Sequence, residues 1–92
     1  MPYSAETKET VKGSPKSLGN QIVRWAIARE FSVIRISKAT GATRQTVYNW
    51  MRGGEVTNAY KDRATALLEI LRETQTAEEA WRKVCRRFNL KS

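Results

Sequence analysis

Two short helical patterns separated by a glycine constrain the fold of this chain more than any other feature. From Val33 to Thr40 apolar residues recur at helical spacing, and the pattern ends at Gly41. Two residues later Thr43 is a favourable N-cap, and a second helix can run from there to the double glycine at 53–54. Glycine ends helices because it adopts the left-handed conformation without steric cost. Residues 32–54 therefore predict two short helices joined by a tight turn, the arrangement of a helix-turn-helix.

The second of these helices has two chemically different faces. At about 100° per residue, Val47, Trp50 and Met51 share one arc, with Thr43 close by. The opposite arc carries Gln45, Tyr48, Asn49 and Arg52. Amides and guanidinium groups make two-point hydrogen bonds to purine edges in the major groove. The pattern therefore indicates a helix with one buried face and one face suited to reading double-stranded DNA.

These residues carry a resemblance to a known family. The segment is similar to the DNA-binding motif of the Cro and phage-repressor class. The small residue of the family's first helix is matched by Ser37, the turn glycine by Gly41, and the two buried positions of its second helix by Val47 and Trp50. The resemblance implies an all-α, compact, five-helix lambda-repressor-like bundle. The chain departs from the family at Thr40, where an aliphatic residue is usual, and at Val33, where a phosphate-contacting glutamine often stands.

Length and composition limit the alternatives. The chain has 92 residues with 40% hydrophobic residues and a net charge of +8, which suits one domain with a polyanionic partner. Residues 17–53 contain six basic residues and one acid, Glu30. A single cysteine, Cys85, excludes an intramolecular disulfide, and with no histidine the chain has no zinc-ligand pattern. The absence of a long apolar run indicates a cytoplasmic protein with no membrane association.

The remaining sequence predicts three further helices and a tail. A helix over about 18–30 is apolar on two sides and should be central in the bundle, and one over 59–73 has a broad apolar stripe. A capping box at 76–79 starts a last helix, which Asn89 can end in a left-handed conformation. Residues 1–16 are polar and contain both prolines, so we expect a flexible N-terminal tail followed by a DNA-binding domain over 17–90.

The predicted site divides into base-reading and backbone-contacting residues. The base edges would be read by Thr43, Arg44, Gln45 and Asn49. The register on the duplex would be set by phosphate contacts from Lys38, Tyr48, Arg52 and Lys61. For Arg35 the sequence favours a phosphate contact and an ordinary solvated position equally.

These features predict a sequence-specific transcriptional regulator of double-stranded DNA, of the small phage-repressor kind. One such helix reads only a few base pairs, so we expect a homodimer, with Phe88 and Leu90 in the last helix as candidates for its interface. Two alternatives stay open: a phage-type factor that docks on RNA polymerase or another host protein, and a DNA-binding subunit in packaging or recombination. We expect no enzyme activity and no cofactor, because no catalytic or metal-binding constellation is present.

Overall fold

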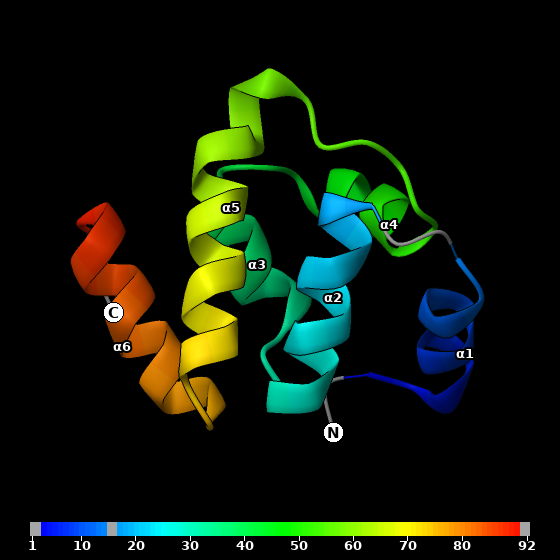
Figure 1. The fold of residues 1–92 in the computed structure, drawn as a ribbon, viewed down its shortest axis with the longest axis horizontal. Coiled ribbons are helices and arrows are strands. Elements are labelled where there is room, and N and C mark those ends of the chain that lie inside the picture. Colours follow the sequence, from blue (N-terminus) through cyan, green and yellow to red (C-terminus); the bar gives the residue numbers. More distant parts are fainter. Residues whose placement is uncertain (1–2, 15–16, 91–92) are drawn as a thin grey trace.

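The computed structural model describes residues 3–14 and 17–90, and that part of the chain contains six helices and no strand. The helices are α1 (Ala5–Gly13), α2 (Leu18–Arg29), α3 (Val33–Thr40), α4 (Arg44–Met51), α5 (Asn58–Glu73) and α6 (Ala77–Phe88). Figure 1 shows α1 and α6 at opposite ends, with α2 in the middle between α1, α4 and α5. The all-helical class predicted from the sequence is confirmed, whereas the count of five helices is wrong.

Local capping sets most of the helix boundaries. Five helices begin after a serine or threonine whose hydroxyl oxygen accepts a hydrogen bond from the backbone N–H three residues later; these N-caps are Ser4, Ser17, Ser32, Thr43 and Thr76. Three helices end in a left-handed residue, with φ of 58° at Glu30, 80° at Gly41 and 57° at Asn89. The helix α4 ends at Met51, two residues before the glycine pair at which the sequence predicted its end.

The core lies around α2, which packs against α1, α4 and α5. Adjacent residues Ile22 and Val23 are both fully buried, which confirms that this helix is apolar on two sides and central. The helix α6 packs against α3 and α5, where the rings of Phe31 and Trp81 lie 6.1 Å apart. Cys85 of α6 is buried in the core, as expected for a small apolar side chain.

The expected flexible tail is a helix where the structure describes it. Ser4 caps α1, and the helix packs against α2 through Val11, which is buried. Before α1, the buried Tyr3 donates a hydrogen bond from its hydroxyl to the carbonyl oxygen of Phe31 at 2.6 Å. The partner of Tyr3 lies 28 residues further along the chain. Residues 1–2 and 15–16 of the predicted tail lie outside the described residues.

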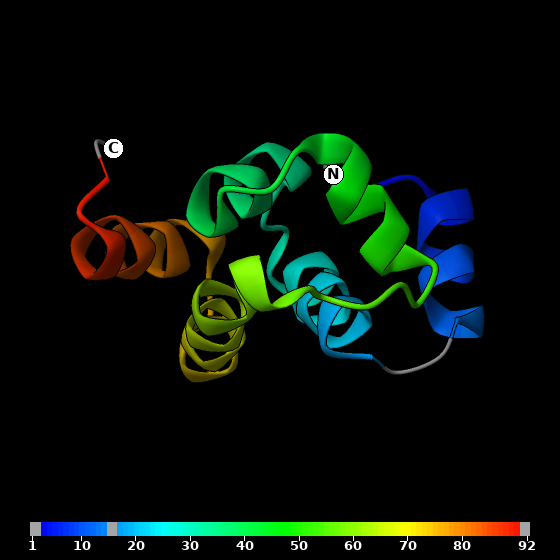
Figure 2. The ribbon, with the colours of Figure 1, turned by 90° about the horizontal axis from the view of Figure 1, so that it is seen from above.

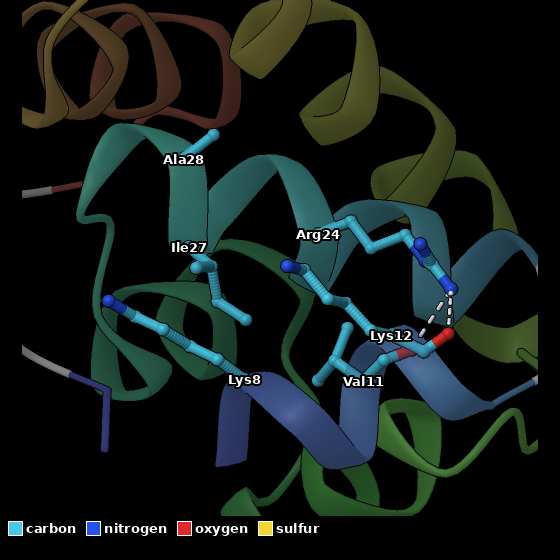
Figure 3. Close-up of a pocket in the computed structure, with 6 residues that line it drawn as sticks. All are labelled: Lys8, Val11, Lys12, Arg24, Ile27 and Ala28. Carbon is cyan, nitrogen blue, oxygen red and sulfur yellow. Dashed lines mark hydrogen bonds between the residues drawn. The ribbon is translucent and has the colours of Figure 1, made fainter. Parts of the chain in front are cut away.

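Two polar side chains of α2 hold the end of α1. Asn20 is fully buried, and its Nδ2 donates to the carbonyl oxygens of Val11 and Met51, both at 3.1 Å. Arg24 donates from Nε to Asn20 Oδ1 and from Nη2 to the carbonyl oxygens of Val11 and Lys12. Figure 3 shows the bonds from Arg24 to α1 beside a pocket of about 460 Å³. Asn20 therefore joins the last turn of α1 to the last turn of α4.

Candidate nucleic-acid interface

The turn between α3 and α4 is fixed by hydrogen bonds at its first residues. Gly41, with φ of 80°, donates its N–H to the carbonyl oxygen of Ser37 at 2.9 Å. The buried Thr40 donates from Oγ1 to the carbonyl oxygen of Ile36 at 2.8 Å and accepts from the N–H of Ala42 at 3.3 Å. A threonine can therefore replace the usual aliphatic residue here, because its hydroxyl is fully hydrogen-bonded although it is buried.

The inner face of α4 is packed against the bundle as its periodicity predicts. Val47, Trp50 and Met51 are buried, and Trp50 is only 1% exposed. The helix α2 approaches this tryptophan closely, because a Cβ placed on Gly19 would lie 2.6 Å from both Cβ and Cγ of Trp50. The ring of Trp50 also meets that of Tyr60 in α5, with centroids 6.2 Å apart and an interplanar angle of 67°. This packing holds the helix in one rotational setting.

The outer face of α4 carries all the side chains expected to read bases. Thr43, Arg44, Gln45 and Asn49 are exposed, and so are Tyr48 and Arg52, with Tyr48 42% exposed. Among the described residues, the side chains of Arg44, Gln45, Asn49 and Arg52 have no intramolecular hydrogen bond or ion pair. Thr43 differs, because its Oγ1 accepts the N–H of Thr46 at 3.2 Å as the N-cap. Its hydroxyl is therefore already engaged in capping.

The expected backbone-contacting residues come from three helices. Lys38 of α3 and Arg44 of α4 border one shallow pocket of about 330 Å³, together with Ile34 and Ser37. Ile34 is unusual for an apolar side chain because it is 52% exposed. The structure therefore brings Lys38 and Arg44 together. Lys61, in the first turn of α5, is exposed.

Three of the six basic residues in 17–53 are used inside the fold. Besides Arg24, the side chain of Arg29 donates from Nε to the carbonyl oxygen of Thr74 at 2.6 Å, and its guanidinium lies 5.0 Å from the Trp25 ring centroid. Arg35 forms an ion pair with Glu78 at 3.1 Å and lies over the ring of Trp81. Arg35, for which the sequence left a phosphate contact and a solvated position equally open, thus has a partner within the fold. The exposed basic side chains left in this segment are Lys38, Arg44 and Arg52.

The helix α1 adds a neighbour that the sequence did not predict for α4. A pocket of about 210 Å³ is bordered by Glu6, Thr7 and Thr10 of α1, and by Tyr48, Met51 and Arg52 of α4. Tyr3, which precedes α1, also lies near Tyr48 of α4. Burial raises the pKa of the Tyr3 phenol well above its ordinary value, and the nearby Tyr48 adds to the rise. The spacing of Ser4 before a short helical pattern ending at Val11 was the available signal for this helix.

Metal-binding groups and membrane-spanning helices were also sought in the described part of the chain. Within residues 3–14 and 17–90 no three side chains of histidine, cysteine, aspartate or glutamate are grouped so that they could hold a metal ion. In the same residues, none of the helices has the length and apolar character needed to cross a bilayer.

Comparison with models of protein families, with curated proteins and with solved structures gave no match in any of the three. The function of the chain is therefore inferred from the chemistry of its own surface.

Proposed function

We propose that the chain is a sequence-specific double-stranded DNA-binding transcriptional regulator, of the phage-repressor kind, in which α3 and α4 act as a helix-turn-helix. The observation that supports this most is the outer face of α4. Gln45, Asn49 and Arg52 are exposed with no partner among the described residues, while the opposite face of the same helix is buried. A rigidly held helix with unpaired amides and guanidinium groups suits the major groove, where such groups find bonding partners.

The proposed roles follow from the chemistry of each group. Arg44 would bond guanine, while Gln45 and Asn49 would bond adenine, each contributing about 1–3 kcal/mol of discrimination between bases. Thr43 would contribute through its methyl group or backbone, since its hydroxyl caps α4. Contacts to phosphate would come from Lys38, Tyr48, Arg52 and Lys61.

The base-reading proposal can be tested by separating specific from non-specific binding. A preferred duplex is first selected from a random pool, and the double variant Gln45→Ala/Asn49→Ala is compared with the matched control Gln21→Ala, an exposed amide on α2. We expect the double variant to lose affinity for the selected duplex by a factor of at least about 10 while keeping its affinity for random duplex. An equal loss on both duplexes would mean that these two amides do not read bases.

We also propose that the chain binds its site as a homodimer, because specific sites for such domains consist of half-sites about 34 Å apart. Phe88 and Leu90 are candidates for the contact, being partly buried at the end of α6 and at the residues beyond it. Phe88 is also covered by Arg63, whose guanidinium carbon lies 5.8 Å from the ring centroid. Sedimentation over a concentration series, with and without a palindromic duplex, measures the stoichiometry directly.

A second candidate function is a factor that docks on RNA polymerase or another host protein. It is favoured by one observation: Ile34 and Tyr48 are the exposed large hydrophobic residues in the described chain, and they belong to α3 and α4. Tyrosine and apolar side chains are favoured in protein interfaces. Retention of a host protein that is insensitive to salt, with no retention of duplex, would favour this candidate. A role in packaging or recombination would instead leave a reporter fused to the chain's own promoter unaffected.

A further inference from the structure

The outer surface of α6 carries a group of basic side chains that neither the fold nor the proposed site uses. Arg82, Lys83, Arg86 and Arg87 are all exposed, and we call them the basic face of α6. The opposite side of the helix is buried through Ala80, Trp81, Val84 and Cys85. From Ala80 to Leu90 the chain contains no acidic residue. The two acids of the helix, Glu78 and Glu79, lie in its first turn, where they neighbour Arg82 and Lys83 but not Arg86 or Arg87, so α6 keeps a net positive charge.

These four cations also lack partners elsewhere in the described part of the chain. The nearby acid Glu78 forms an ion pair with Arg35 instead. On a helix, residues three or four positions apart are neighbours, so the pairs 82/86, 83/87 and 83/86 place like charges side by side and destabilise the helix. By contrast, Arg24, Arg29 and Arg35 all have partners within the fold. An anion from outside the chain would remove the repulsion on α6.

The position of α6 indicates where that anion would come from. Glu78, Arg82 and Arg86 are spaced four residues apart, so they form a row along the helix, and Glu78 bonds Arg35 of α3. The row therefore begins beside α3. Figure 2 shows α3 and α4 together along one side of the molecule, with α6 next to α3 at the end away from α1. A partner lying across α3 and α4 would reach this row if it extended past α3.

A DNA duplex has the required length and charge. The longest dimension of the molecule is 33 Å. At about 3.4 Å per base pair, a duplex covers that distance in roughly 10 base pairs, more than the few that α4 can read.

We propose that the basic face of α6 binds backbone phosphates of the same duplex whose bases α4 reads. This inference rests on the proposed DNA-binding function. It adds a second backbone contact at a distance from α4, contributing affinity and salt dependence but no sequence preference. It also limits which surface of α6 can form the homodimer contact, because a two-fold contact through the basic face would bring like charges together. A dimer contact on α6 would then be confined to the region of Phe88 and Leu90.

The test compares two variants with the same change in net charge. Arg82→Gln/Arg86→Gln removes two charges from the basic face, and Lys12→Gln/Arg72→Gln removes two exposed charges from α1 and α5. Binding to a random-sequence duplex of about 24 base pairs is measured across a salt series. Because each neutralised phosphate contributes about 0.9 to the slope of log K against log salt, the first variant should lower the slope by about two units. The control should lower it much less.

Each other outcome has a definite meaning. If the unchanged protein binds no duplex, the proposed DNA-binding function fails, and the inference fails with it. If it binds duplex and the slope is the same in the Arg82→Gln/Arg86→Gln variant, only the inference about α6 fails. An equal fall in the slope in both variants would show an effect of net charge alone and would also refute the inference.

A second assay measures binding to vesicles of anionic lipid. If the Arg82→Gln/Arg86→Gln variant loses vesicle binding while its duplex binding is unchanged, the basic face binds a membrane surface instead. Folding of the variants is checked by helical circular dichroism.

Discussion

Replacing Asn20 by leucine tests whether one buried amide joins the N-terminal helix to the helix proposed to read DNA. The side chain of Asn20 is fully buried and makes three hydrogen bonds, two donated from Nδ2 and one accepted at Oδ1. Leucine has a similar size but can make none of them. The carbonyl oxygen of Val11 would still accept a bond from Arg24 at 3.0 Å. The carbonyl oxygen of Met51 would lose the bond from Asn20 that it receives at the end of α4.

The magnitude follows from these bonds. A hydrogen bond contributes a net of about 1 kcal/mol, and a buried acceptor left without a partner costs about 1–3 kcal/mol. With the Val11 carbonyl still bonded, we expect a loss of about 3 kcal/mol in the free energy of unfolding. A domain of this length has a total of about 5–15 kcal/mol. Since 1 kcal/mol corresponds to about 4–8 °C at this size, the melting temperature should fall by roughly 15 °C.

The assay is urea denaturation followed by circular dichroism, with Gln21→Leu as the control. Gln21 is the next residue on the same helix, but it is exposed, so its replacement should change stability by less than about 0.5 kcal/mol. If Asn20→Leu and Gln21→Leu were equally stable, the bonds from Asn20 to the last turns of α1 and α4 would contribute nothing to stability. The N-terminal helix would then be held in place by its other contacts, such as the bond from Tyr3 to Phe31.

Three further predictions concern other contacts. Gly19→Ala should destabilise the protein by about 1–3 kcal/mol in urea denaturation, because the new Cβ would overlap Trp50; stability within error of the original would contradict the close approach. For Tyr3 the folded pKa is raised above the unfolded one, so its contribution to stability is complete below about pH 10 and is lost as the pH rises above that value. Tyr3→Phe should remove this alkaline loss, and an unchanged pH profile would assign the loss to another group. Arg52→Ala should weaken binding to every duplex and lower the salt slope by about one unit, whereas a loss confined to one sequence would mean that it contacts a base.

The sequence was sufficient for features that depend on neighbouring residues. Ser32 and Thr43 act as N-caps within their own segments, so the start of α3 and α4 could be read directly. Helical periodicity likewise predicted which side chains of α4 face out, and the exposure of Gln45 and Asn49 confirms it. Both inferences need only the geometry of one helix and no knowledge of the tertiary packing.

Features that depend on distant residues were missed. The helix α1 is held by Tyr3 bonding to Phe31, 28 residues later, and by Asn20 bonding to Val11. Neither pairing has a local signal, so a polar segment with few apolar residues was predicted to be flexible. The use of the basic residues was missed for the same reason. Arg24 is one of the six basic residues in 17–53, but only the fold shows that its guanidinium donates hydrogen bonds to carbonyl oxygens of α1.

The bonds from α2 to α1 bear on how this protein can be shortened for experiments. A fragment beginning at Ser17, where the sequence suggests the domain starts, would remove four of the six hydrogen bonds made by the side chains of Asn20 and Arg24. It would also uncover the apolar surface beneath Val11. Expression vectors that retain residues from Tyr3 onward should therefore give the more soluble and more homogeneous preparation.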